Sequence, residues 1–386
     1  MNIGLFLGHP AHFHMLKNAA VRLSNKGHNV QFVIKKKDIL ISLLENAGYA
    51  YTLIRGDRGN GIVDLVGSVI GMEINMCKFL KQNKIDVLVG STLSFATSAL
   101  KRIPTIIMGE DDSAVIPRYT YIVYPWATTI LTPTVCDNGR WNNKSTKYPS
   151  YHELAYLHPN HFTPDCQLVE KYGIDVSIPF FIIRFSSLNA YHDGGIQGIN
   201  TEIAQRLIDT LSPHGQIYIT SERELEPQFE PYRIRINPLD MHHVMAFASL
   251  YIGDSQTMAA EAGVLGTPFV RFNDFVGRIG YLRELEDVYQ LGYGIHATPL
   301  SEESTIRRND GSLQPSGVEA LYDAVETLVA MPAEERRALY ATRREKMLSE
   351  KIDYAKFLTW FIENYPDSQQ QTRDNQQNDA FWAQFK

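Results

Sequence analysis

Residues 251–268 read YIGDSQTMAAEAGVLGTP, a pattern that predicts a strand, a tight polar turn and a helix. The strand ends at Gly253, and Asp254 or Ser255 is suited to cap the helix that follows. Free backbone N–H groups and the positive end of the helix dipole then face any ligand at the strand end. Together with the hydroxyls of Ser255 and Thr257, the turn suits a diphosphate. A plain N-cap on a buried helix is the alternative interpretation.

Glu261 extends this segment into the next helical turn. It lies four residues after Thr257, and therefore on the same face of the predicted helix. A carboxylate at that place can accept hydrogen bonds from the two hydroxyls of a ribose. The segment thus predicts a nucleotide site, with phosphates at the turn and the ribose at Glu261.

The same order of a short apolar run, a polar loop and a helical pattern recurs on both sides of this segment. Such alternation is typical of a parallel sheet with crossover helices, in which ligands bind at the carboxyl ends of the strands. The runs that we expect to be strands are 3–7, 29–34, 86–89 and 105–108 in the first half, and 180–185, 216–220, 250–252 and 268–271 in the second.

We therefore predict an α/β protein with two doubly wound, Rossmann-like parallel-sheet domains that face a central cleft, followed by C-terminal helices. The predicted divisions are an N-terminal domain at 1–163, a nucleotide-binding domain at 164–345, a C-terminal helix at 346–365 and a tail at 366–386. We expect the tail to be disordered, because it is rich in Gln, Asn and Asp.

Composition narrows the classes of function. The 386 residues carry a formal net charge of −6, so a non-specific nucleic-acid binder is not expected. Three cysteines without a CxxC pair indicate a reducing compartment rather than a disulfide scaffold or a zinc site. The N-terminus does not resemble a signal peptide and no apolar run is long enough to span a bilayer, so we expect a cytoplasmic protein. The aromatic segment 116–126 leaves a peripheral contact with the inner face of the membrane open, although a buried aromatic cluster explains it as well.

The nucleotide segment resembles that of GT-B glycosyltransferases and of non-hydrolysing UDP-GlcNAc 2-epimerases. In those families an Asp-Ser-Gly-Gly turn is followed by a helical Glu and a Gly-x-Pro, and here Gln256 and Thr257 replace the two glycines. The resemblance implies that Ser255, Gln256, Thr257 and Glu261 contact the nucleotide. It also implies that the loop 236–240, which contains Leu239, surrounds the base through its backbone.

A broader resemblance covers the chain to about Trp360. The chain is similar to a prokaryotic family of predicted glycosyltransferases, domain of unknown function family 354. The residues that carry the resemblance are 8–14, 153–159, 184–185 with 192–193, and 253–275. A two-domain GT-B fold and the use of a sugar nucleotide are what this family label implies.

Three histidines follow the first predicted strand, namely His9, His12 and His14. Their spacing lacks a nearby carboxylate or cysteine, so it is a weak metal signal and we predict no metal. His12 lies where the GlcNAc transferases of cell-wall synthesis, which this loop resembles, carry the His of their Gly-rich loop. That resemblance implies a general base that takes a proton from an acceptor hydroxyl. Capping of the following helix is the alternative, and His14 is the second candidate.

Three adjacent carboxylates, at 110–112, follow the strand expected at 105–108. Carboxylates crowded at the end of a parallel strand are costly unless they are solvated or functional. The resemblance to the 2-epimerases, which place a His-x-Glu-Ala-Gly sequence here, implies a catalytic role for Glu110. Their N-terminal Gly-Thr-Arg-Pro is absent, however, and Gly8-His9-Pro10 stands in its place. This departure argues against epimerisation.

Arg184, at the end of the strand 180–185, and Ser186 behind it are further candidates for the nucleotide site. A guanidinium can bind phosphate through two hydrogen bonds, but Arg184 could equally form a salt bridge between the domains.

These observations favour a metal-independent glycosyltransferase without a cofactor. We expect a nucleotide-diphosphate sugar donor, with a UDP-sugar favoured, and a carbohydrate or lipid-linked acceptor in surface polysaccharide or glycoconjugate synthesis. The second hypothesis is an epimerase or hydrolase similar to UDP-GlcNAc 2-epimerase, in which Glu110 leads the chemistry. The third is a nucleotide-sugar-binding protein without catalysis.

Overall fold

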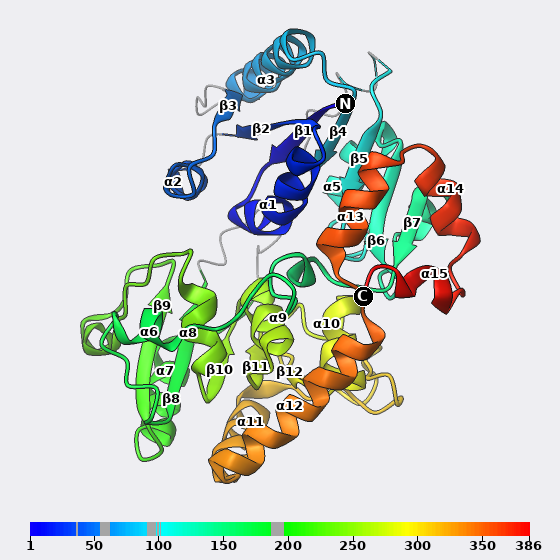
Figure 1. Cartoon of the computed structure of the whole chain (residues 1–386). Coiled ribbons are helices and arrows are strands. Elements are labelled where there is room, and N and C mark those ends of the chain that lie inside the picture. The colour runs from blue at the N-terminus through cyan, green and yellow to red at the C-terminus, as the bar shows by residue number, and fades with distance from the viewer. Residues whose placement is uncertain (36–37, 55–61, 91–97, 99, 101, 187–196) are drawn as a thin grey trace. The chain divides into compact units, whose positions relative to one another are not determined.

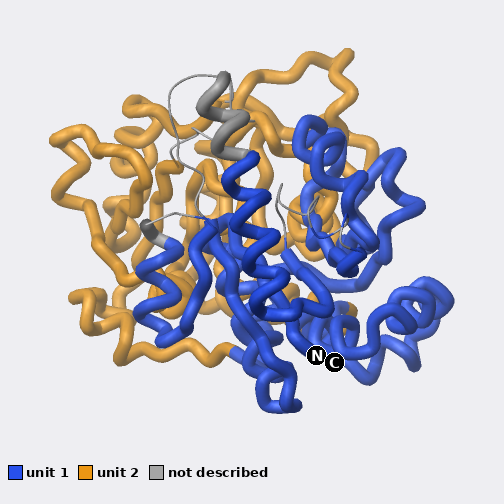
Figure 2. Tube along the Cα trace, turned by 90° about the horizontal axis from the view of Figure 1, so that it is seen from above, with its two compact units in different colours: residues 1–161, 351–386 blue, residues 162–350 orange. Residues whose placement is uncertain are grey.

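The computed structural model describes the chain except residues 36–37, 55–61, 91–97, 99, 101 and 187–196, together with the side chains of 38–39 and 62–69. The chain forms two compact units, which Figure 2 shows in different colours. The first unit contains Met1–His161 and Lys351–Lys386, and the second contains Phe162–Glu350. The end of the chain therefore belongs to the same unit as its beginning.

The first unit is built on a parallel sheet whose strand order is β3-β2-β1-β4-β5-β6-β7. Several of its strands are buried along their whole length, as expected of apolar runs covered on both faces. The strands are β1 (Asn2–Leu7), β2 (Asn29–Lys35), β3 (Tyr51–Ile54), β4 (Val87–Gly90), β5 (Thr105–Met108), β6 (Thr129–Pro133) and β7 (Ser145–Tyr148).

The helices of the first unit follow its strands, and Figure 1 shows them around the sheet. Helix α1 starts with Pro10 at its first position, where the missing N–H costs nothing, and the side chain of His9 caps it. The elements are α1 (Pro10–Asn25), α2 (Asp38–Asn46), α3 (Ile62–Gln82), α5 (Pro117–Val123), η1 (Tyr124–Trp126), η2 (Gly139–Lys144) and η3 (His152–Ala155).

The end of the chain is helical and ordered by packing. Helix α13 (Tyr354–Glu363) packs against α1 and η3, and α14 (Asp367–Asp374) packs against β7, as Figure 1 shows in orange and red. Beyond them, α15 (Asp379–Ala383) contains Trp382, which is buried with its ring centroid 5.6 Å from that of Phe357. The disorder predicted for 366–386 is therefore wrong, because aromatic residues within this polar segment bury themselves against α13.

The second unit contains a parallel sheet with the strand order β12-β11-β10-β8-β9. Its strands are β8 (Phe180–Phe185), β9 (Gln216–Ser221), β10 (Leu250–Gly253), β11 (Phe269–Phe272) and β12 (Gly292–Ile295). Its helices are α6 (Cys166–Glu170), α7 (Thr201–Leu211), η4 (Pro227–Tyr232), α8 (Met241–Phe247), α9 (Gln256–Leu265), α10 (Gly280–Arg283), η5 (Glu284–Val288), α11 (Gly317–Ala330) and α12 (Ala333–Glu350).

Helix α9 lies at the centre of the second unit. From Ala259 to Leu265 every residue is buried, and all of them except Glu261 are apolar or small. It ends at Gly266, whose φ of 86° favours glycine. Gly253, at the end of the preceding strand, is required by close packing, because a Cβ there would lie 2.6 Å from the hydroxyl of Tyr251. Small residues thus place the start of α9 directly at the end of β10.

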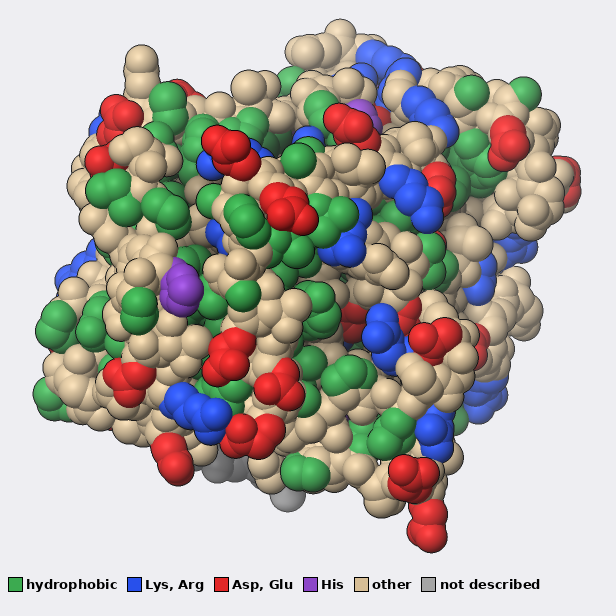
Figure 3. Space-filling view, turned by 90° about the horizontal axis from the view of Figure 1, so that it is seen from below, with side chains coloured by type: hydrophobic (Ala, Val, Ile, Leu, Met, Phe, Trp, Pro, Cys, Tyr) green, Lys and Arg blue, Asp and Glu red, His purple; other side chains and the backbone are tan. Residues whose placement is uncertain are grey.

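Charged side chains of both signs are interspersed with hydrophobic ones on the face drawn in Figure 3. In the part of the chain that is described, no helix is long and apolar enough to cross a bilayer.

Candidate functional site

The carboxyl ends of β8, β10 and β11 are linked by a buried aspartate. One carboxylate oxygen of Asp254 accepts hydrogen bonds from the backbone N–H and the hydroxyl of Ser186, at 2.7 and 2.8 Å. The side-chain amide of Asn273 donates to the carbonyl oxygen of Asp254 at 2.9 Å. Burial raises the pKa of Asp254, although the hydrogen bonds from Ser186 act against that shift. Three neighbouring strand ends are thereby held in one arrangement.

The turn at residues 254–257 forms the helix start that the sequence predicts. The Ser255 hydroxyl oxygen accepts the N–H of Met258 at 3.4 Å, so Ser255 is the N-cap of α9. Residues 255–258 are partly exposed, whereas the remainder of the helix is buried. The cap alternative and the ligand interpretation are therefore compatible, because the cap leaves the start of the helix accessible.

Gln256 is held by an ion pair that the sequence analysis missed. Nη1 of Arg271 donates to Oε1 of Gln256 at 2.5 Å, and Nε of Arg271 donates to Glu286 at 2.9 Å. Both ionic side chains are buried, with Arg271 fully so. Burial raises the pKa of Glu286, and the neighbouring Arg271 opposes the shift. An Arg within the otherwise apolar strand FVRF was the available signal.

Glu261 lies one turn into α9, as expected, but it already has a protein partner. Its Oε1 is 3.0 Å from Nε2 of His242, which comes from α8, and both side chains are buried. A ribose bound by Glu261 would therefore share the carboxylate with His242.

The loop before α8 is braced from within. The backbone N–H of Leu239 donates to the side chain of Asn237 at 3.0 Å, and Tyr172 donates to Asp240 at 2.7 Å. Because the Leu239 N–H is occupied, a base held by this loop would have to use other backbone groups, such as carbonyl oxygens.

Arg184 forms an ion pair with Glu222, the residue that follows β9, and its side chain is 16% exposed. Its partner lies within the same unit rather than in the other domain. If Arg184 also contacts a phosphate, its guanidinium must bind the phosphate and Glu222 at the same time. Ser186 donates its hydroxyl to Asp254, as described above, and residues 187–189 and 192–193 lie outside the described part of the chain.

In the first unit, the histidines after β1 have different surroundings. Nδ1 of His12 accepts the backbone N–H of Gly8 at 3.2 Å. Because the accepting nitrogen carries no proton, neutral His12 is protonated on Nε2. His9, not His12, caps α1. His14 is buried, with its ring centroid 5.4 Å from that of Tyr156.

Glu110 follows β5 and is bound by a residue that the sequence analysis did not assign. Its Oε1 accepts the backbone N–H of His152 at 2.7 Å, and its Oε2 lies 3.1 Å from Nδ1 of the same residue. By strand order, these residues lie at the same carboxyl edge as His12, which follows β1. The segment 153–159, which carries part of the family resemblance, begins just after His152, and no local pattern indicated a partner 42 residues earlier.

The aromatic segment 116–126 is partly buried and partly exposed. Tyr124 is fully buried, and burial strongly raises its pKa. Tyr121, Ile122 and Trp126 have exposed fractions of 59%, 56% and 39%. The segment thus combines a buried tyrosine with three exposed apolar side chains.

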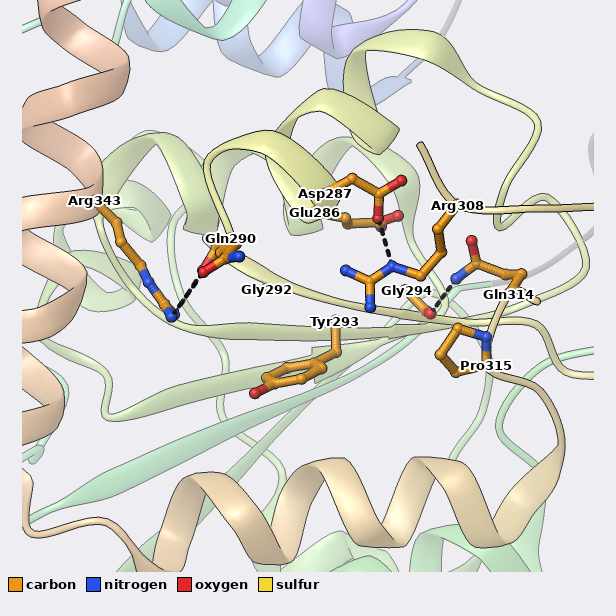
Figure 4. Close-up of a pocket in the computed structure, with 10 residues that line it drawn as sticks. All are labelled: Glu286, Asp287, Gln290, Gly292, Tyr293, Gly294, Arg308, Gln314, Pro315 and Arg343. Carbon is orange, nitrogen blue, oxygen red and sulfur yellow. Dashed lines mark hydrogen bonds and ion pairs between the residues drawn. The ribbon is translucent and has the colours of Figure 1, made fainter. Parts of the chain in front are cut away.

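One pocket of the second unit, of about 240 Å³, lies beside β12 and η5 (Figure 4). Arg308 pairs there with Asp287 at 2.9 Å, and Arg343 donates to Gln290. None of the predicted site residues lines this pocket. Within the described residues, no three His, Cys, Asp or Glu side chains are grouped so as to hold a metal ion.

Comparison with known proteins identifies the family. Residues 1–275 match the family described as "Protein of unknown function (DUF354)". The chain belongs to this family. The search of curated proteins found no match to this chain.

Solved structures share the fold at low sequence identity. UDP-GlcNAc 2-epimerase from Neisseria meningitidis, bound to UDP-GlcNAc, has a TM-score of 0.61 at 11% identity, covering 94% of this chain and 100% of its own. The glycosyltransferase SsfS6 of Streptomyces sp. SF2575, complexed with thymidine diphosphate, has a TM-score of 0.57 at 11% identity, with 94% and 100% covered. The spinosyn rhamnosyltransferase SpnG, complexed with spinosyn aglycone, has a TM-score of 0.57 at 13% identity, with the same coverage. The predicted GT-B fold, two parallel-sheet α/β domains with C-terminal helices, is therefore confirmed.

Proposed function

We propose that this protein is a glycosyltransferase that uses a nucleotide-diphosphate sugar, with a UDP-sugar favoured, to build a surface polysaccharide or glycoconjugate. The start of α9 carries the proposal. Residues 255–258 are accessible at the carboxyl end of β10, while the rest of the helix is buried. A ligand can therefore reach the helix at the end where its N–H groups point outward and its dipole is positive.

The pyrophosphate of the donor is assigned to this turn. Ser255, Gln256 and Thr257 supply backbone N–H groups and side-chain donors, and Arg184 adds a cation from the neighbouring strand β8. The charge that develops on the leaving nucleoside diphosphate is stabilised by these fixed donors, without a requirement for a metal ion. The nearby Asp254 favours the same anion when it is protonated, and the raised pKa of Asp254 extends the pH range in which this happens.

The remaining parts of the donor are assigned to neighbouring elements. The ribose hydroxyls bind Glu261, whose carboxylate is oriented by His242. The base lies against the backbone of the loop that contains Leu239. A phosphate contact by Ser186 requires its hydroxyl to turn away from Asp254, to which it donates in this structure. A carboxylate held by a buried imidazole is a well-oriented acceptor for a diol.

The proton of the acceptor hydroxyl is assigned to the first unit, where His12, Glu110 and His14 are the candidates. Neutral His12 carries its proton on Nε2 and is therefore arranged as a hydrogen-bond donor, suited to a phosphate or sugar oxygen. His14 is buried under Tyr156 and ranks last. Of the three candidates, Glu110 is the residue that we assign to this proton transfer, either directly or through the histidine that it binds.

The acceptor is a carbohydrate or a lipid-linked saccharide. The exposed side chains of Tyr121, Ile122 and Trp126 support a peripheral contact with a membrane surface, where a lipid-linked acceptor would be presented.

The test is a thermal-shift panel of UDP, GDP, CDP, ADP, TDP and their common sugars, with and without Mg²⁺. A ligand at a hundred times its Kd stabilises the folded state by about 2.7 kcal/mol, which is readily measured. We expect one diphosphate to dominate, and Ser255→Ala and Glu261→Ala to remove its effect.

A second helix cap in the same unit provides the matched control. Asn200 caps α7 by accepting the N–H of Ile203 at 2.9 Å. Asn200→Ala should therefore lower the free energy of unfolding by about 1 kcal/mol, as loss of a helix cap does, and should keep the thermal shift caused by the ligand. If no nucleotide shifts the melt of the wild type, the start of α9 is a helix cap only and the proposal fails.

The second candidate function is 2-epimerisation of a UDP-sugar. It is favoured by Glu110, whose place at the end of β5 matches the catalytic carboxylate that the epimerase resemblance implies. Epimerisation exchanges the C2 hydrogen with solvent, so incubation of UDP-GlcNAc in D₂O should give deuterium at C2. Transfer or hydrolysis without C2 exchange would exclude the epimerase, and binding without any turnover would indicate a non-catalytic protein.

A further inference from the structure

Glu110 holds one histidine at two points, and this fixes both partners. The backbone N–H of His152 donates to Oε1 at 2.7 Å, while Nδ1 lies 3.1 Å from Oε2. The two side chains are only 16% and 11% exposed, so the pair is largely shielded from water. A carboxylate that contacts Nδ1 retains the proton on that nitrogen. In neutral His152, Nε2 therefore carries a lone pair.

The ring plane of His152 is fixed by aromatic packing. It stacks on Tyr354, the first residue of α13, with centroids 5.5 Å apart and planes 27° apart. Tyr354 also stacks on Tyr148 at 4.5 Å and 21°. Burial, with a contribution from the charge of Glu110, raises the pKa of Tyr148 and Tyr354, so both phenols stay protonated. The imidazole of His152 is thus stacked on a phenol that keeps its proton.

Nε2 of His152 is buried and has no hydrogen-bond partner among the residues that the structure describes. A buried nitrogen left without a partner costs free energy, which a hydroxyl donor at that point would recover. Another histidine–carboxylate pair of this unit differs, because Nε2 of His161 is occupied by Asp353 at 2.8 Å. Both Glu110 and His152 follow strands, β5 and β7, at the sheet edge where ligands bind in folds of this type.

We propose that His152 is the catalytic base for an acceptor hydroxyl and that Glu110 acts through it as a positioning residue. This inference rests on the proposed function and specifies its chemistry. The acceptor O–H proton passes to Nε2 as the acceptor oxygen bonds to the sugar C1, and the bond from C1 to the phosphate oxygen breaks. The nucleoside diphosphate leaves with that electron pair. Glu110 stabilises the imidazolium that forms on His152.

The tautomers of the two histidines provide a test that is independent of turnover. Long-range ¹H–¹⁵N NMR of the ¹⁵N-histidine-labelled full chain at neutral pH should show His152 protonated on Nδ1 and His161 protonated on Nε2. Assignment uses His152→Asn and His161→Asn, and thermal melts show that both variants are folded. A neutral His152 protonated on Nε2 would overturn the proposal.

The kinetic test uses UDP-GlcNAc as the donor probe, water as the acceptor, and released UDP as the signal. His152→Asn should lower the rate by about 100-fold or more, as expected for loss of a general base, and should keep the thermal shift caused by UDP-GlcNAc. It should also remove the fall in rate at low pH that titration of a base produces. Glu110→Gln should shift that fall along the pH axis, and His161→Asn should leave the rate unchanged.

The two proposals fail in different ways. If no sugar nucleotide of the panel binds the wild type, the proposed function is overturned. If the wild type binds UDP-GlcNAc and releases UDP, and His152→Asn does so at the same rate, the role of His152 is overturned and the proposed function stands.

Discussion

The carboxyl edges of the two sheets are constructed differently. In the second unit, Asp254 is bound by a hydroxyl and an amide of Ser186, and burial raises the pKa of Asp254. In the first unit, Glu110 is bound by the backbone N–H and the imidazole of His152. The hydrogen bonds of Asp254 hold three strand ends of the second unit together, whereas in our proposal the Glu110–His152 pair of the first unit transfers a proton. If both proposals hold, the second unit binds the anion and the first unit supplies the chemistry.

The tryptophans allow the two units to be followed separately. All four, Trp126, Trp141, Trp360 and Trp382, belong to the first unit. Tryptophan fluorescence therefore reports unfolding of the first unit, while far-UV circular dichroism reports both. Each substitution below changes one unit. Comparison of the fluorescence and circular dichroism transitions of the same sample therefore shows which of the two units has lost stability.

The largest effect is expected for Arg271→Met in the second unit. The change leaves Glu286 buried without its cation and frees Gln256 at the start of α9. Loss of one partner of a buried pair costs about 3–5 kcal/mol. Urea unfolding followed by circular dichroism should show this loss, and affinity for the nucleoside diphosphate should fall.

The double variant with Glu286→Leu is the control for Arg271→Met, because it removes both charges and should recover most of the stability. If Arg271→Met alone unfolds at the wild-type urea concentration, the ion pair does not stabilise the second unit.

An intermediate effect is expected at Asp353 in the first unit, where the end of the chain joins the sheet. Burial alone would raise the pKa of Asp353, but hydrogen bonds from His161, the backbone of Lys356 and Asn160 lower it to about 2. A pKa that is lowered from 3.8 contributes stability above pH 3.8, and this contribution is lost as the pH falls through about 2. Its size is roughly 2 kcal/mol.

Asp353→Asn tests this contribution, because the amide oxygen can still cap α13 while the charge is removed. Tryptophan fluorescence should show a loss of roughly 2 kcal/mol at pH 7 and little difference from the wild type near pH 2. An equal difference at both pH values would show that packing, not charge, is responsible.

The two sheet edges also show which features could be predicted from the sequence and which could not. The parallel sheets and the start of α9 followed from local signals, namely apolar runs, a polar turn and a capping serine. His152, His242 and Arg271 could not be assigned in this way, because their partners Glu110, Glu261 and Glu286 are brought to them by strand order and helix packing.

The end of the chain gives the same lesson for the fold. Its Gln- and Asn-rich composition predicts disorder, but two of its aromatic side chains, Trp382 and Phe385, are buried against Phe357. Composition averages over a segment, whereas order is decided by whether a few large side chains find a surface to cover. That surface is formed by α13, which lies outside residues 366–386, so the sequence of the segment itself could not predict the contact.

The smallest effect is expected for Asp254→Asn in the second unit. The amide oxygen can accept both hydrogen bonds from Ser186, so the unfolding free energy should change by less than about 1 kcal/mol at pH 7. In the wild type the pKa of Asp254 is raised above 3.8, so its contribution to stability is present below pH 3.8 and is lost as the pH rises through the raised pKa. This dependence is opposite in sign to that of Asp353 and should be absent in the variant.

Because Asp254→Asn also removes a negative charge beside the start of α9, UDP should bind the variant more tightly than the wild type, most clearly at high pH. Weaker binding to Asp254→Asn, with Ser186 still in place, would mean that the carboxylate itself contributes to the site, and the two sheet edges would then be more alike than their hydrogen bonds indicate.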